Sequence, residues 1–317
     1  MAHRITILDD YQDAALGSAD WAPLLNSYEI DVVREHIADP DDLVARLESS
    51  RVIVAMRERT AFPHEVLERL PQLRLLVTTG MKNPGIDRAA ASQQGITVCG
   101  TDGSWGTVTE LVFGMMIALG RHIIEEDRAV HEGGWQHTLG RGLAGSTLGI
   151  LGLGRLGGEV ADIAPAFGME VIAWSPHLTQ ERADAHGARA VGERELYSAS
   201  DFLTIHLPLA KGTRGLVGRE QLGWMAPRSY LVNTSRGPIV DEEALIETLR
   251  AGRIAGAALD VFDQEPLPVE HPLRSLPGVL LTPHIGYVTE QTYEVFYGQA
   301  IEDIQAYDSG APVRLLG

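Results

Sequence analysis

Three charged side chains stand where β-rich runs end in the second half of the chain. Arg236 lies in "VNTSRGPIV", Glu265 in "ALDVFDQEPLP" and His284 in "VLLTPHIG". An arginine fork binds a carboxylate at two points, a histidine exchanges a proton near neutral pH, and a carboxylate orients that histidine and favours its charged form. The carboxyl ends of parallel strands share one edge of a sheet, so we expect these catalytic candidates to converge.

A glycine-rich stretch marks the same predicted edge. "TLGILGLGRLGGEV", residues 147–160, places Gly152, Gly154 and Gly157 in the spacing G-x-G-x-x-G between an apolar β-rich run and a helical pattern. Such a turn lets backbone N–H groups face phosphate oxygens, which predicts a dinucleotide site. A glycine-rich turn without a ligand is the alternative. Likewise, each charged candidate has a structural reading: a surface pair for Arg236, a solvated turn for Glu265 and a satisfied strand end for His284.

The strand after the glycine loop bears on which nicotinamide would bind. Selection of NAD by this motif uses an acid about 20 residues later, but "VIAWSPHLT" has Ser175 there. A serine gives no repulsion to a 2′-phosphate. The nearest cations are His177 and Arg182, and we expect Arg182 to fall in the next helix and to point away. The sequence therefore predicts NAD as the default cofactor, with NADP also accepted.

The elements that carry these residues alternate along the chain. Two series of short β-rich runs and helical patterns indicate βαβ units and two parallel sheets. They are separated by a longer helical stretch at about 107–131, and the glycine loop opens the second series. We predict an α/β protein with two doubly wound domains, in which a dinucleotide-binding domain, 102–286, is inserted into a flavodoxin-like substrate domain, 1–101 and 287–317.

Composition bounds the partners. The 317 residues are 44% hydrophobic and 22% charged, as in globular proteins, and the formal net charge of −17 argues against nucleic acid. The single cysteine, Cys99, excludes an intrachain disulfide and a thiolate metal cluster. The longest apolar run, 111–120, is too short to cross a bilayer. We expect a cytoplasmic protein with no metal and no membrane partner.

Four motifs in one order carry a resemblance to a known family. GLGRLG, NTSRG, ALDVF…EP and PHIG, together with "LVTTGMKNPGIDRAAA" and "TVTELVFGMMIALGR", resemble the D-isomer-specific 2-hydroxyacid dehydrogenases. The resemblance implies hydride transfer between NAD(P)H and C2 of a small 2-oxo or D-2-hydroxy acid. His284 would exchange the proton, Glu265 would hold its imidazolium, and Arg236 would bind the carboxylate.

The same resemblance implies further binding residues. For the cofactor they are Arg155, Leu156, Pro208, Thr213, Thr234, Ser235, Asp260 and Gly286, besides the three glycines and Ser175. For the substrate they are Arg57, Thr79, Gly80 and Met81. Asp260 would accept a hydrogen bond from the carboxamide of the nicotinamide. The helical stretch 107–131 would pack against its symmetry mate in a homodimer.

Departures from the family pattern keep the substrate open. Met81, Lys82, Asn83 and Pro84 interrupt the small-residue run of the usual substrate loop. Lys82 either adds a positive charge to the site or faces water, and Arg57 either binds a distal anionic group or pairs with Glu58 on the surface. A nucleotide-sensing scaffold or corepressor on the same fold is the competing function. Formate dehydrogenases are disfavoured, because they have glutamine where Glu265 stands.

Overall fold

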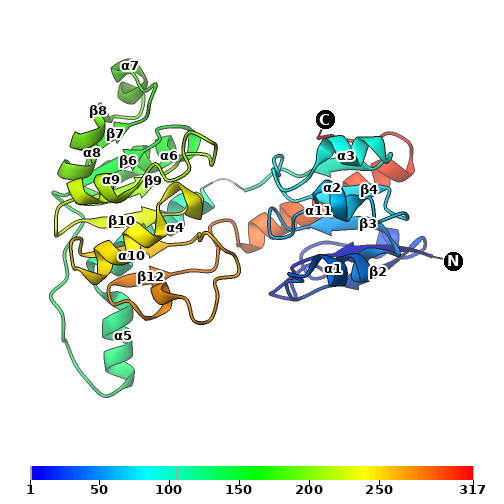
Figure 1. Cartoon of the computed structure of the whole chain (residues 1–317), viewed down its shortest axis with the longest axis horizontal. Coiled ribbons are helices and arrows are strands. Elements are labelled where there is room, and N and C mark those ends of the chain that lie inside the picture. Colours follow the sequence, from blue (N-terminus) through cyan, green and yellow to red (C-terminus); the bar gives the residue numbers. More distant parts are fainter. Residues whose placement is uncertain (1, 105, 317) are drawn as a thin grey trace. The chain divides into compact units, whose positions relative to one another are not determined.

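The structure, a computed structural model, describes residues 2–104 and 106–316. Its contacts divide the chain into two compact units, Met1–Trp105 with Tyr287–Gly317, and Gly106–Gly286. Each unit holds one sheet in which every pair of neighbouring strands is parallel, with helices alongside (Figure 1). The predicted α/β class with two doubly wound sheets is confirmed.

The first unit is built on a five-stranded sheet in the order β2-β1-β3-β4-β5. This is the flavodoxin-like order that the sequence predicts. Its strands are β1 (His3–Ile7), β2 (Tyr28–Val32), β3 (Ser50–Ala55), β4 (Leu75–Thr78) and β5 (Thr97–Gly100). Its helices are the 3-10 turn η1 (Ala22–Leu24), α1 (Pro40–Leu47), α2 (His64–Leu67), α3 (Arg88–Gln93) and α11 (Glu290–Asp308).

Both faces of this sheet are covered, which explains the continuous apolar runs of its strands. Tyr293, Phe296 and Tyr297 of α11 pack on one face, in a cluster that includes Ile5 and Cys99. The other face packs against α1, α2 and α3. Cys99 is fully buried, and burial raises the pKa of its thiol to about 12.

The C-terminal segment is fastened to β5 and α11. Leu315 forms an isolated antiparallel β-bridge with Cys99, and the Gly100 amide donates to the Arg314 carbonyl. Arg314 Nε donates to Asp303 Oδ1 at 3.0 Å, while Asp303 Oδ2 is buried with no hydrogen-bond partner in the described chain. Burial raises the pKa of Asp303 to about 7, against the lowering effect of Arg314.

The second unit is built on a seven-stranded sheet in the order β12-β11-β10-β9-β6-β7-β8. Numbered from its own first strand, this is the dinucleotide-binding order 3-2-1-4-5-6 with one strand added. The strands are β6 (Thr147–Leu151), β7 (Glu170–Trp174), β8 (Arg189–Ala190), β9 (Phe202–Ile205), β10 (Tyr230–Asn233), β11 (Gly256–Leu259) and β12 (Val279–Leu281). The 3-10 turns are η2 (Ala164–Phe167), η3 (Gly237–Ile239) and η4 (Pro272–Ser275).

Helices of the second unit lie on both faces of its sheet. They are α4 (Thr107–Gly120), α5 (Ile123–His131), α6 (Arg155–Ile163), α7 (Gln180–Asp184), α8 (Glu193–Ala199), α9 (Arg219–Trp224) and α10 (Glu242–Arg250). One core cluster joins α4 and α6 to the sheet, and a second joins α8, α9 and α10 to it.

The single helix predicted at 107–131 is wrong, because the structure has two helices there that bend by 62°. The break follows Gly120, whose carbonyl accepts from Arg141 N, and His122 takes a left-handed backbone with φ 54°. An α-helix cannot continue through that conformation. Apolar side chains of α4 pack inside their own unit, where Val112, Met115, Met116 and Leu119 are buried.

No single helix among residues 2–104 and 106–316 is both long and apolar enough to span a membrane. In the described parts of the chain, α4 and α5 counted together have the length and composition of a span, with a bend of 62° between them. Much of α4 is buried in the core of its unit.

Candidate functional site

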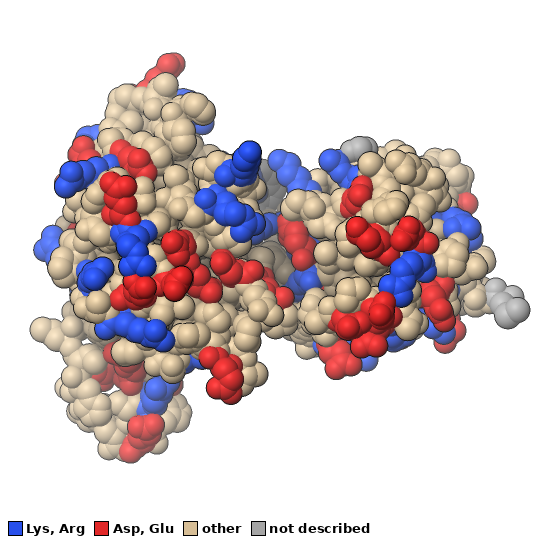
Figure 2. Space-filling view, viewed as in Figure 1, with Lys and Arg blue, Asp and Glu red and all other residues tan. Residues whose placement is uncertain are grey.

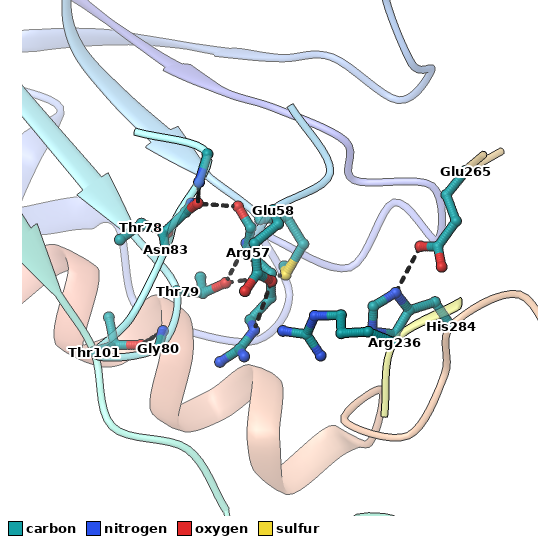
Figure 3. Close-up of polar contacts among 12 residues, drawn as sticks. Arg57, Glu58, Thr78, Thr79, Gly80, Asn83, Thr101, Arg236, Glu265 and His284 are labelled. Carbon is teal, nitrogen blue, oxygen red and sulfur yellow. Dashed lines mark hydrogen bonds and ion pairs between the residues drawn. The ribbon is translucent and has the colours of Figure 1, made fainter. Parts of the chain in front are cut away.

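His284 and Glu265 form an ion pair at the carboxyl end of the second sheet (Figure 3). His284 follows β12 in a left-handed conformation, φ 55°, which few L-residues adopt. Its Nδ1 lies 2.6 Å from Glu265 Oε2, and Glu265 Oε1 accepts from the Phe262 amide at 2.9 Å. The histidine side chain is 19% exposed. The carboxylate on Nδ1 fixes the orientation of the imidazole ring.

Asp260 fixes the segment that carries His284. This residue follows β11 and is fully buried, and its carboxylate accepts from Thr282 Oγ1 at 2.5 Å and from the amides of Ile285 and Gly286, each at 2.8 Å. Burial raises the pKa of Asp260, although all three hydrogen bonds oppose the shift. Three donors on one carboxylate explain how His284 keeps its unusual backbone.

Arg236 lies in a loop that Asn233 organises. Asn233, at the end of β10, is buried; its Oδ1 accepts from the Ser235 amide at 3.0 Å and its Nδ2 donates to the Arg236 carbonyl at 3.0 Å. The guanidinium Nη1 donates to the Ser235 carbonyl at 2.7 Å. Sequence reasoning missed Asn233, although an asparagine that closes a turn onto its own backbone is a recognisable signal.

The glycine loop has the geometry that a dinucleotide requires. Gly152 has φ +100°, and a Cβ there would lie 2.8 Å from Leu207 Cδ2. A Cβ on Gly157 would lie 2.2 Å from the Gly152 carbonyl oxygen, so this glycine brings α6 close to β6. Gly154, just before α6, has nothing within 4 Å of its Cβ position. A tight turn, close packing and open space before a helix N-terminus fit a pyrophosphate.

Flanking candidates surround that turn. Arg155, the first residue of α6, places Nη1 3.5 Å from Glu159 Oε1, and Leu156 is partly buried beside it. Thr213 Oγ1 donates to the Pro208 carbonyl at 2.7 Å, which closes the loop after β9.

The loop after β9 joins the Arg236 loop. Ser235 Oγ donates to the Leu207 carbonyl. Thr234 Oγ1 is buried with no hydrogen-bond partner in the described parts of the chain. A buried hydroxyl without a partner is costly, so it fits a polar group of a bound cofactor.

Ser175 follows β7 as predicted, but Arg182 does not point away. The Ser175 carbonyl accepts from Leu178 N at 3.0 Å, which forms a turn ahead of α7. Arg182 Nη1 then donates to the His177 carbonyl at 3.3 Å. The guanidinium therefore lies over the turn that begins at the end of β7, instead of facing outward from the helix.

The predicted substrate loop lies in the first unit, after β4 (Figure 3). Gly80 has φ +88°, and its amide donates to Thr101 Oγ1 at 2.9 Å. Asn83 is buried, and its Nδ2 donates to the Arg57 carbonyl at 2.7 Å and to Thr78 Oγ1 at 2.9 Å. Met81 is 40% exposed.

Asn83 thus organises the loop whose small-residue run it interrupts, and neither it nor Thr101 was given a site role from sequence. Asparagine bonding back to nearby backbone was again the available signal for Asn83. Thr101 gave none, because its partner is 21 residues away. Lys82 is exposed.

Arg57 is built into the same loop. Its backbone is left-handed, φ 52°, and its amide donates to Thr79 Oγ1 at 2.9 Å. A Cβ on Gly80 would lie 2.0 Å from Arg57 Nη1, so the guanidinium rests on the glycine backbone. It also lies 5.7 Å from the Tyr287 ring centroid and 3.6 Å from Glu58. Arg57 is therefore a partly buried member of the loop and not a simple surface pair.

Comparison with known proteins agrees with this geometry. Residues 113–286 match the model of the D-isomer specific 2-hydroxyacid dehydrogenase, NAD binding domain. D-3-phosphoglycerate dehydrogenase of Bacillus subtilis is 35% identical over 92% of this chain and 55% of its own length. Hydroxypyruvate reductase of Thermotoga maritima is 36% identical over 84% of this chain and 88% of its own.

A solved structure extends the likeness to both units. The phosphoglycerate oxidoreductase from Vibrio cholerae has a TM-score of 0.92 and 35% identity, covering 98% of this chain and 100% of that one. The chain spans about half the length of the D-3-phosphoglycerate dehydrogenases that it matches, 44% and 55% in two of them.

Proposed function

Because the chain belongs to the family of D-isomer specific 2-hydroxyacid dehydrogenases, we propose that it transfers a hydride between a nicotinamide dinucleotide and C2 of a small 2-oxo or D-2-hydroxy acid. The observation that carries this proposal is the His284–Glu265 pair, 2.6 Å apart. A formate-oxidising site would need no proton acceptor, whereas a carboxylate on a histidine serves a step in which a proton is exchanged.

The side chains divide the chemistry between them. His284 Nε2 gives a proton to the substrate oxygen in reduction and takes it back in oxidation, while Glu265 stabilises the imidazolium. Arg236 binds the substrate carboxylate and polarises the carbonyl. A bound nicotinamide supplies or accepts the hydride.

We assign the cofactor to the second unit. Gly152, Gly154 and Gly157 would hold its pyrophosphate together with Arg155 and Leu156. Thr234 Oγ1, the buried hydroxyl without a described partner, would bind its nicotinamide end with Asp260 nearby. The 206–213 loop, Ser235 and Gly286 would complete the site.

The first unit is assigned to the substrate. Arg57, Thr79, Gly80 and Met81 form the loop that would contact the acid. The Gly80 amide is already bonded to Thr101, so the proposal gives Met81 N the larger share in binding a carboxylate.

Both NAD and NADP are proposed as cofactors, with NAD the default. Ser175 brings no charge to the end of β7. Arg182 adds a cation over the same turn, and a nearby arginine is the group that accommodates a 2′-phosphate. This support for NADP is stronger than the sequence suggested.

The deciding experiment is a panel of 2-oxo acids assayed by the loss of NADH or NADPH absorbance. Glyoxylate, hydroxypyruvate, pyruvate, phenylpyruvate and 3-phosphohydroxypyruvate sample size and charge. We expect turnover of at least one, with either nicotinamide. If calorimetry shows that the protein binds the dinucleotide but no acid is turned over, the result would instead support a nucleotide-sensing scaffold.

A homodimer in the cytoplasm completes the proposal. The exposed apolar side chains of α5 and the following loop support an interface there; they are Ile123, Ile124, Val130, Trp135 and Leu139. Twofold dimers are the commonest closed assemblies, and a free buried thiol at Cys99 suits a reducing compartment. Light scattering should give twice the chain mass of 34.4 kDa, and a monomer at micromolar concentration would contradict the interface.

A further inference from the structure

The loop that carries Glu265 is held by hydrogen bonds from outside the site described so far. Residues 261–271 run between β11 and η4, and few backbone groups in such a segment have strand or helix partners. Glu265 can meet His284 only if this loop keeps its shape. The contacts that hold the loop are therefore part of how the carboxylate is aimed.

Arg274 spans the loop just beyond Glu265. Its Nε donates to the Pro268 carbonyl at 2.8 Å, and its Nη2 donates to the Leu267 carbonyl at 2.6 Å. One planar guanidinium thus binds two successive carbonyls, two and three residues after Glu265. A lysine in its place has a single ammonium and lacks the fork that matches both acceptors.

The residues next to Arg274 are anchored to the core and to α10. Its neighbour Leu273 is 1% exposed and belongs to the core cluster beneath α8, α9 and α10. His271 Nε2 lies 2.9 Å from Glu242 Oε1 on α10, and His271 Nδ1 accepts from Leu273 N at 3.3 Å. The guanidinium therefore links the loop to the core, in which the neighbouring Leu273 is buried.

The other side of the loop rests on the Arg236 segment. A Cβ on Gly237 would lie 2.0 Å from the Phe262 carbonyl carbon. The Phe262 amide, in turn, donates to Glu265 Oε1. The Glu265 turn is thus held between the backbone of Gly237 on one side and the Arg274 fork on the other.

We propose that Arg274 is a positioning residue that holds the Glu265 carboxylate on His284 through the carbonyls of Leu267 and Pro268. This inference rests on the proposed function, because it assigns Arg274 a part in the same proton exchange. Both of these hydrogen bonds from Arg274 go to backbone carbonyls of the loop, and neither goes to the side chain of Glu265 or His284. Its effect therefore has to pass through the loop.

The test compares Arg274→Ala with Arg274→Lys, Glu265→Gln and the double variant. Arg274→Ala should lower kcat/KM for a good 2-oxo acid by on the order of tenfold to a hundredfold, with a larger change in kcat than in KM. Its alkaline limb of reduction should move to lower pH, the direction expected for Glu265→Gln. Lysine should rescue only part of the loss.

The double variant separates positioning from general destabilisation. If Arg274 acts only through Glu265, Arg274→Ala adds no further shift of the alkaline limb on a Glu265→Gln background. A matched control is Arg74→Ala in the first unit, because Arg74 Nη1 also donates to two backbone carbonyls, those of Pro71 and Leu73. That variant should leave the pH profile in place.

Hydrogen exchange supplies a readout that needs no substrate. The Phe262 amide, protected by Glu265 Oε1, should exchange faster in Arg274→Ala and at the native rate in Arg74→Ala. An unchanged limb and unchanged exchange in Arg274→Ala, in an enzyme that reduces 2-oxo acids, would overturn the inference and leave the function standing. Failure of the native enzyme to reduce any acid would overturn the function, while the exchange rates would still test whether Arg274 holds the loop.

Discussion

Arg57 and His284 share a backbone conformation that side chains with a Cβ seldom adopt. Their φ angles are 52° and 55°. Holding such a residue costs about 1–3 kcal/mol, so the surroundings must determine it. Asn83 and Thr79 do this for Arg57, and Asp260 does it for His284 through the amides that follow. Buried polar side chains thus give both assigned residues their direction.

The Glu265–His284 pair predicts a specific pH response. Glu265 Oε2 lies 2.6 Å from His284 Nδ1, and reduction requires a proton on the imidazole. Glu265→Gln removes the opposite charge, so the falling limb of kcat/KM for reduction should move to lower pH. The measurement is a pH profile at saturating NADH. A limb at the native pH in the variant would show that the pair is not the titrating unit.

Arg236 should not tolerate its usual conservative replacement. Arg236→Lys keeps the charge but loses the planar fork that binds a carboxylate at two points. We expect kcat/KM to fall, and the loss of transition-state stabilisation calculated from that fall to be about 2–4 kcal/mol. Steady-state kinetics on the best acid of the panel measures this. Near-native kcat/KM would remove Arg236 from the site.

At the scale of elements, the end of β7 should decide between the two nicotinamides. We expect the native preference to stay within about tenfold, or ~1.4 kcal/mol. Ser175→Asp should sharply reduce use of NADPH and spare NADH, because the new carboxylate repels a 2′-phosphate. Arg182→Gln should weaken the binding of NADPH and leave that of NADH unchanged, since Arg182 lies over the same turn. A thousandfold native preference for NADH would mean that other groups select the cofactor.

Sequence periodicity predicted most of these elements because strands buried on both faces read as short apolar runs. "VIVA" in β3 and "LLVT" in β4 are buried at every position. The bend after Gly120 escaped prediction, since it depends on the Arg141 amide 21 positions away in the chain. Arg236, Glu265 and His284 could be proposed from residue type and strand-end position. The bonds from the Gly80 amide to Thr101 and from the Phe262 amide to Glu265 could not, because they depend on how the loops fold.

On the scale of the whole molecule, acidic residues outnumber basic ones by 43 to 26, and both kinds are spread over the visible face (Figure 2). One acid, Asp303, lies instead in the core with a buried, unpartnered oxygen among the described residues. Arg314 pairs with its other oxygen and ties the C-terminal segment to α11.

Asp303 should make stability depend on pH in the opposite sense to a carboxylate whose pKa is lowered on folding. Its pKa of about 7 exceeds the unfolded value, so the folded state holds a proton that the unfolded state releases. The free energy of unfolding should therefore fall as pH rises from about 4 to about 7, by at most ~1.4 kcal/mol per pH unit. Urea unfolding at both ends of this window should show that Asp303→Asn removes this slope.

The exposed Asp41 is the control for that comparison. Asp41→Asn should leave the slope of the native protein unchanged, because this side chain is 83% exposed. An equal slope in Asp303→Asn and the native protein would mean that the Asp303 carboxyl titrates as it does in the unfolded chain.

Cys99, buried beneath α11 in the first unit, is a probe of local opening. Thiol reagents attack the thiolate, which this site suppresses by burial and by a pKa of about 12. Every alkylation of the native protein therefore records one transient opening of the first unit. The second unit has no cysteine and leaves no mark. The rate of Cys99 alkylation therefore measures the opening of the first unit alone.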